Sequence, residues 1–123
     1  MNDLGRQAED LVAEHYRNLG FQIIERNYIS PTGKQIGEID LVAKKERLLV
    51  FVEVKLRRSN KYGTAFEAVN FSKQRKLVKI VKLFLQKNLV YEDFDYRIDV
   101  AAVNIDNHQK SVTILTNAIE DSD

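Results

Sequence analysis

Cysteine and tryptophan are absent from this chain of 123 residues, and proline occurs once. Without cysteine the chain can form no disulfide, no thiolate nucleophile and no cysteine zinc site. Long apolar runs are also missing: the longest spans residues 48–52, whereas a membrane helix needs about 20 apolar residues. The first residues contain no basic stretch followed by an apolar core, so no signal peptide is expected. These absences predict a cytoplasmic protein that has no membrane partner.

Charge is distributed unevenly along the chain, although the net charge is only +1. Residues 44–87 contain thirteen Lys/Arg and three Asp/Glu, a balance of +10, and the remainder contains six and fifteen, a balance of −9. A basic surface on an otherwise acidic protein is typical of domains that bind a phosphate backbone. An ordinary solvated helix face would carry the same lysines, so the charge pattern alone leaves both interpretations open.

Hydrophobic periodicity predicts two helices and five strands in a single domain that spans residues 1–123. Apolar residues at helical spacing predict one helix over 4–19, which Gly20 ends, and another over 72–86. Apolar runs between turn residues predict strands over 21–28, 36–43, 48–56, 96–103 and 112–115. The order α-β-β-β-α-β-β predicts an α/β domain with a mixed central sheet flanked by helices. The helix between the third and fourth strands allows a parallel crossover there.

The second and third strands are joined by a short link, which favours an antiparallel hairpin with Glu46 and Arg47 at its turn. Alternation then places three apolar pairs on one face: Ala43–Val50, Leu41–Val52 and Ile39–Val54. The pairs on the other face are Val42–Phe51, Asp40–Glu53 and Glu38–Lys55. Two carboxylates directly opposite each other repel, and each raises the pKa of the other. A purely structural sheet has no use for such a pair.

Asp40, Glu53 and Lys55 share this second face and predict a metal-assisted phosphodiester site. A divalent cation such as Mg²⁺ or Mn²⁺ relieves the repulsion because it prefers carboxylate oxygens as ligands. Lys55 could hold an attacking water or neutralise negative charge that develops during the reaction. The alternative is a sheet edge at which Glu53 and Lys55 pair with solvent and with neighbouring charges.

Two segments in this hairpin resemble a known family: Gly-Glu-Ile-Asp-Leu-Val-Ala at 37–43 and Val-Phe-Val-Glu-Val-Lys at 50–55. They resemble the YraN-like family of predicted nucleases, which belongs to the PD-(D/E)xK, or restriction endonuclease-like, superfamily. The resemblance covers nearly the whole chain, including residues 5–9, the helix around Gln74, and residues 97–100. It implies the restriction endonuclease-like fold, whose core order α-β-β-β-α-β matches the predicted order. The superfamily's proline before the aspartate is often absent, and here Ile39 occupies that position.

The resemblance implies roles for five residues of this chain. Asp40 and Glu53 would bind one or two Mg²⁺ or Mn²⁺ ions, and Lys55 would be the catalytic lysine that orients the attacking water. Glu9 resembles the helix-borne acid that archaeal Holliday junction resolvases and other branches add to the metal ligands; the alternative is a solvent-facing glutamate. Gln74 resembles a glutamine that several branches place beside the site; the alternative is an ordinary polar residue of the first helical turn.

A set of basic residues is predicted to hold the phosphate backbone: Arg57, Arg58, Lys61, Lys76, Lys79 and Lys82. Phosphate contacts carry little base information, so we expect a Mg²⁺-dependent endonuclease that selects DNA by structure rather than by sequence. The alternative is a non-catalytic nucleic-acid-binding module of the same fold. Three aromatic residues near these positions could stack on bases, although packing is the alternative for the two phenylalanines: Tyr62, Phe66 and Phe71.

Other polar residues of the chain receive lesser predictions. Asp99, inside the apolar strand 96–103, is predicted to be a hydrogen-bonded structural acid rather than a catalytic one. Glu38 either acts beside the metal ligands or pairs with Lys55. The two histidines, His15 and His108, lie far apart in a chain without cysteine, which argues against a histidine metal site. Because related resolvases act as dimers, a homodimer is a further expectation.

Overall fold

The computed structural model describes residues 3–29, 37–57, 71–106 and 109–119. In these parts the chain forms two α-helices, one short 3-10 helix and five strands. In chain order they are α1 (Asp3–Asn18), β1 (Gln22–Ile29), β2 (Glu38–Lys45), β3 (Leu48–Arg57), α2 (Phe71–Lys87), η3 (Leu89–Tyr91), β4 (Asp95–Asp106) and β5 (Gln109–Leu115). The predicted order is confirmed, and η3 is the one described element that periodicity did not predict.

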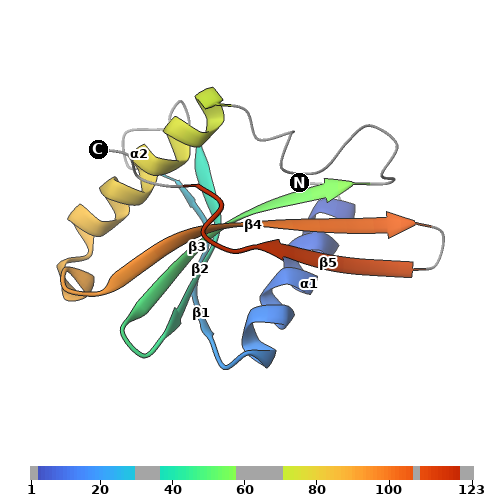
Figure 1. Ribbon diagram of the computed structural model, residues 1–123, viewed down its shortest axis with the longest axis horizontal. Coiled ribbons are helices and arrows are strands. Elements are labelled where there is room, and N and C mark those ends of the chain that lie inside the picture. The colour runs from blue at the N-terminus through green and yellow to red at the C-terminus, as the bar shows by residue number, and fades with distance from the viewer. Residues whose placement is uncertain (1–2, 30–36, 58–70, 107–108, 120–123) are drawn as a thin grey trace.

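The described strands form a mixed sheet in the order β1-β2-β3-β4-β5, with α1 and α2 on opposite sides (Figure 1). The pairs β1–β2, β2–β3 and β4–β5 are antiparallel, whereas β3 and β4 are parallel. The chain makes the parallel connection through α2, as the sequence predicts. Neither helix that the structure describes is long and apolar enough to cross a membrane.

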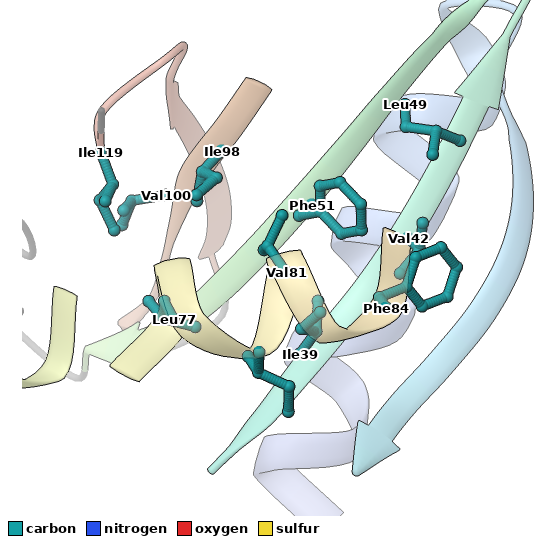
Figure 2. Packing of buried hydrophobic residues seen from close by; sticks show 11 residues of the cluster. Ile39, Val42, Leu49, Phe51, Leu77, Val81, Phe84, Ile98, Val100 and Ile119 are labelled. Carbon is teal, nitrogen blue, oxygen red and sulfur yellow. The ribbon is translucent and has the colours of Figure 1, made fainter. Parts of the chain in front are cut away.

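A separate hydrophobic cluster lies between the sheet and each helix. Residues of α1 pack against one face of β2, β3 and β4, in a cluster formed by Ala8, Val12, Ala13, Tyr16, Leu41, Ala43, Val50, Val52, Ala101 and Val103. The α2 cluster (Figure 2) consists of Ile39, Val42, Leu49, Phe51, Leu77, Ile80, Val81, Phe84, Ile98, Val100 and Ile119. Because both faces of β3 are covered, its sequence is a continuous apolar run rather than an alternating one.

The β2–β3 hairpin has the predicted turn and register near the turn. Its backbone pairs run from Lys45–Leu48 through Ala43–Val50 to Leu41–Val52. Beyond Leu41, however, the predicted alternation is wrong. Ile39 does not share the face of Leu41 and pair with Val54; it packs in the α2 cluster, whereas Leu41 packs against α1.

The neighbouring strand β1 reverses its alternation at the same level. Arg26, the partner of Leu41, contacts acids of α1, whereas Tyr28, the partner of Ile39, packs in the α2 cluster. Between them lies Asn27, whose φ of 54° is in the left-handed region. Simple alternation therefore breaks at one residue in each strand: Leu41 and Ile39 face opposite sides of the sheet, and so do their partners on β1. Asp40 lies between Ile39 and Leu41, where this change occurs on β2.

Candidate active site

The candidate site begins where the backbone ladder between β2 and β3 ends. The last backbone pair is Leu41–Val52, and the predicted Asp40–Glu53 pair is not part of the ladder. Instead, the backbone N–H of Val54 donates a hydrogen bond of 2.7 Å to Asp40 Oδ2. The Asp40 carboxylate thus takes the place of a backbone acceptor and is held between the two strands.

Asp40 and Glu53 are brought together, as the sequence predicts, although not as a ladder pair. Both are buried, with 8% and 5% of their surface exposed. Burial, a hydrogen bond to Glu53 and the negative charge of Glu53 raise the pKa of Asp40 well above its ordinary range. The charge of Glu9 adds to this increase, and the hydrogen bond from Val54 opposes it. When no cation is bound, these surroundings therefore favour the protonated form of Asp40.

Two lysines meet the carboxylate of Glu53. Lys73 Nζ lies 3.2 Å from Glu53 Oε2, and Lys55 Nζ lies 4.0 Å from the same oxygen. Lys73 thus forms an ion pair with Glu53 Oε2, although in the part of the chain that the structure describes this buried oxygen accepts no hydrogen bond of regular geometry. Such an oxygen is costly in a folded protein unless another group binds it.

The two lysines differ in how readily they keep a proton. Burial and a hydrogen bond with Lys73 lower the pKa of Lys55. Burial also acts to lower the pKa of Lys73, but the hydrogen bond with Lys55 and the charge of Glu53 outweigh it and raise that pKa. Of the two lysines, Lys55 therefore loses its proton more readily and Lys73 keeps its proton more firmly.

Glu9 is buried on α1, with 6% of its surface exposed, so the solvent-facing alternative is wrong. Its Oε1 lies 3.4 Å from Arg26 Nη2 and 3.3 Å from Asn27 Nδ2, both on β1. The Oδ1 of Asn27 is itself buried and has no hydrogen-bond partner among the residues that the structure describes. Glu9 is close enough to Asp40 for its charge to raise the pKa of that carboxyl group. The third predicted acid is thus near the site and is held there by β1.

Three residues at this site were missed by sequence reasoning: Lys73, Arg26 and Asn27. Lys73 had a detectable signal, because it lies four residues before Leu77 and so continues the inward stripe of α2. Asparagine adopts a left-handed backbone more readily than most residues, which is a weak signal for the change at Asn27. Arg26 had no local signal, since its partners lie on another element.

The structure describes some of the other predicted binding residues. Gln74 follows Lys73 in the first turn of α2 and is half-buried. Four predicted phosphate-binding residues are described: Lys76 and Lys79 are exposed, whereas Lys82 and Arg57 are half-buried. Several predicted residues lie outside the described residues, as does the side chain of Phe71: Arg58, Lys61, Tyr62 and Phe66.

Asp99 is fully buried and hydrogen-bonded, as the sequence predicts. Its carboxylate accepts hydrogen bonds from Tyr16 Oη at 2.7 Å, from the backbone N–H of Asn117 at 2.8 Å and from Arg97 Nε at 3.1 Å. Burial and the hydrogen bond to Asp99 raise the pKa of Tyr16. This network joins α1, β4 and the segment after β5, and its donors leave Asp99 no role in the candidate site.

The donor set fits a magnesium ion better than a metal that needs an all-protein cage. Among the described residues, no three His, Asp or Glu side chains form a group that could hold a metal ion. Mg²⁺ usually keeps several waters and binds through one or two carboxylates together with substrate phosphates. Asp40 and Glu53 supply two carboxylates, and a divalent cation could bind the buried Glu53 Oε2 in place of Lys73, because this oxygen accepts no regular hydrogen bond among the described residues.

The described residues of the candidate site lie within the segment of this chain that matches a known protein family. The sequence model of a family described as "Uncharacterised protein family UPF0102" matches residues 8–103. A UPF0102 protein of Clostridium botulinum (strain 657 / Type Ba4) is 37% identical over 120 residues, which cover 96% of this chain and 94% of the relative. A UPF0102 protein of Chloroherpeton thalassium (strain ATCC 35110 / GB-78) is 38% identical over 107 residues, which cover 87% of this chain and 79% of the relative.

Proposed function

The chain belongs to the uncharacterised protein family UPF0102, and we propose that it is a metal-dependent nuclease that hydrolyses phosphodiester bonds of nucleic acid. The preferred substrate in this proposal is DNA selected by its structure. One observation carries it: the buried carboxyl groups of Asp40 and Glu53 lie together with the amines of Lys55 and Lys73. The resemblance to the PD-(D/E)xK superfamily supports the same activity and the restriction endonuclease-like fold.

Burying these charges is expensive, which favours a functional over a structural explanation. Like charges a few ångströms apart oppose folding, and each buried ion also loses hydration. Apolar residues at Asp40 and Glu53 would extend the two clusters at lower cost. Perturbed titratable groups that have specific charged partners are concentrated at functional sites.

Asp40 and Glu53 would hold the Mg²⁺ or Mn²⁺ ion, with Glu9 behind Asp40. When bound, the ion would supply Lewis acidity that stabilises the extra negative charge on the phosphoryl oxygens. The hydrogen bond from Val54 orients the Asp40 carboxylate before any ligand arrives. Because the carboxylate is already oriented, no free energy has to be spent on orienting it during the reaction.

Lys55 would orient the attacking water and accept its proton. Burial and the hydrogen bond with Lys73 lower its pKa, so its ammonium group loses a proton more readily than that of an ordinary lysine, and its position two residues after Glu53 on β3 keeps it near the carboxylates. Orientation of the water in line with the leaving oxygen is the second contribution of this chain. Lys76 and Lys79 are exposed residues of α2 that follow Lys73 along the helix, and they would hold the phosphate backbone.

The experiment is a cleavage assay on labelled duplex, single-stranded, flapped and four-way-junction DNA and on RNA. Each substrate is incubated with Mg²⁺, with Mn²⁺ or with a chelator, and the wild type is compared with Asp40→Asn. The matched control is Asp95→Asn, since Asp95 is an exposed acid at the start of β4. We expect metal-dependent cleavage by the wild type and by the control, and none by Asp40→Asn.

The same assay distinguishes the enzyme from a non-catalytic nucleic-acid-binding module. Such a module would bind with an affinity that falls with salt, and Asp40→Asn would leave that binding unchanged. Binding without cleavage on every substrate and with either metal would contradict the nuclease proposal.

A further inference from the structure

Lys73 lies at the partly exposed end of the inward stripe of α2, in the first turn of the helix. It precedes Leu77 by one helical turn on the inward stripe of α2, where Leu77, Val81 and Phe84 pack in the cluster (Figure 2). It also lies in the first turn of the helix, which contains no acidic residue, and the helix dipole disfavours a cation there. A nearby anion would offset the unfavourable interaction with the dipole.

Glu53 provides that anion. The 3.2 Å between Lys73 Nζ and Glu53 Oε2 is shorter than the 4.0 Å between Lys55 Nζ and the same oxygen. Lys73 is thus the nearer cation to an oxygen that a divalent ion would bind in the proposed nuclease. Because both cations need Oε2, Lys73 and the divalent ion compete for it.

Displacement of Lys73 from Glu53 by a divalent ion would change the charge balance of the site. In the free protein the positive charge of Lys73 offsets the charge of Glu53. A divalent ion at Glu53 would take over the charge that Lys73 offsets, and the phosphate of the nucleic acid is an anion that Lys73 could then contact. The side chain of Lys73 is 44% exposed and that of Lys55 only 20%, so Lys73 is the lysine on the side from which substrate approaches.

We propose that Lys73 is a second active-site lysine, which is the counter-ion of Glu53 in the free protein and binds the scissile phosphate in the substrate complex. This inference rests on the proposed nuclease function. It assigns the two lysines different tasks: Lys55 acts on the water and Lys73 on the phosphate. No bond to Lys73 forms or breaks.

Two measurements on purified protein test this inference with the variants Lys73→Met, Lys73→Gln and Lys73→Arg. The control is Lys87→Met, because Lys87 is an exposed lysine at the opposite end of α2. Calorimetric titration with Mn²⁺ in the absence of nucleic acid measures the competition. We expect Lys73→Met and Lys73→Gln to bind Mn²⁺ about fivefold more tightly than the wild type, since a positive charge near the ion is removed.

Single-turnover cleavage measures the phosphate contact. We expect the rate to fall by about a hundredfold in Lys73→Met and Lys73→Gln, and Lys73→Arg to recover part of it because the charge is kept. Circular dichroism and thermal unfolding identify a variant that fails to fold, and the other neutral variant then replaces it.

The outcomes separate this inference from the nuclease proposal. Unchanged or weaker Mn²⁺ binding in the folded neutral variants overturns the counter-ion role. Cleavage at the wild-type rate in those variants overturns the phosphate role. If the wild type cleaves no substrate, the nuclease proposal fails together with the phosphate role, whereas the Mn²⁺ titration still decides whether Lys73 is the counter-ion.

Discussion

The backbone N–H of Val54 donates a hydrogen bond of 2.7 Å to the side chain of Asp40, immediately beyond the last backbone pair of β2 and β3. The candidate metal ligand is therefore also the group that joins the two strands at this end. The same hydrogen bond fixes the direction of the carboxylate and leaves its other oxygen for Glu53 or for a cation. This double role makes the effects of changing Asp40 specific and measurable.

Asp40→Asn is expected to stabilise the metal-free protein, and more so as pH rises. The folded protein raises the pKa of Asp40, so it holds a proton that the unfolded chain has released. The favourable contribution of the protonated carboxyl is complete below the unfolded pKa and is lost progressively as pH rises toward the raised value. Asparagine keeps an acceptor for Val54 and cannot ionise. We expect a gain of about 1 kcal/mol or more at pH 8, because one pKa unit corresponds to about 1.4 kcal/mol.

This prediction is checked by urea unfolding with a chelator present at pH 5 and at pH 8. The exposed acid Asp95 again supplies the control, since Asp95→Asn removes a carboxylate that lies outside the candidate site. A lower stability of Asp40→Asn at both pH values would show that the charge of Asp40 does not oppose folding.

Divalent cations are expected to raise the melting temperature of the wild type but not that of Asp40→Asn or Glu53→Gln. A ligand that binds only the folded state stabilises it by about 2.7 kcal/mol at a hundred times its Kd. Because the ion must displace the proton of Asp40, the stabilisation should increase with pH. Thermal unfolding with Mn²⁺, Mg²⁺ or chelator checks this without any substrate. Equal stabilisation of wild type and both variants would place the ion elsewhere.

Lys55→Met is expected to lower single-turnover cleavage by about a hundredfold or more while nucleic-acid binding persists. Lys55→Arg separates the two tasks of this side chain, because arginine keeps the charge and does not give up its proton. If proton acceptance matters, Lys55→Arg is as slow as Lys55→Met; if only positive charge matters, it retains much of the rate. The exposed Lys87 supplies the control through Lys87→Met.

Tyr16→Phe is expected to destabilise the protein by about 1–3 kcal/mol, since the buried carboxylate of Asp99 loses one of its donors. Cleavage by the folded variant should match that of the wild type because this network lies outside the candidate site. Urea unfolding and cleavage below the melting temperature are the measurements. Tyr91→Phe is the control, as the described contacts of Tyr91 include ring packing against Phe84 and Phe94. A large loss of activity without a loss of stability would implicate Asp99 in the reaction.

Replacing Lys76 and Lys79 together by glutamine is expected to weaken binding to all DNA sequences alike. If each lysine contacts one phosphate of duplex DNA, the slope of log affinity against log salt should decrease in magnitude by about 1.8. The cleavage rate at saturating enzyme should change little. Fluorescence anisotropy across a salt series checks the slope, and an unchanged slope would remove these two lysines from the DNA-binding surface.

The sequence by itself determined the order of the elements and the central part of the hairpin. Strand alternation has a period of two residues and the turn at Glu46 is short, so the register of Ala43 with Val50 follows from local pattern. The same local pattern brought Asp40, Glu53 and Lys55 together, because all three lie on one hairpin.

Only the tertiary structure decided what lies at the ends of that hairpin and what reaches it from other elements. Ile39 faces the opposite side of the sheet from the one that alternation predicts. The paired strand β1 changes its alternation at the same level, where Asn27 has a left-handed backbone. Lys73 and Glu9 come from helices on opposite sides of the sheet, and their contacts depend on how those helices pack. Periodicity reports which face of an element is apolar, whereas contacts between distant elements depend on packing that no local pattern encodes.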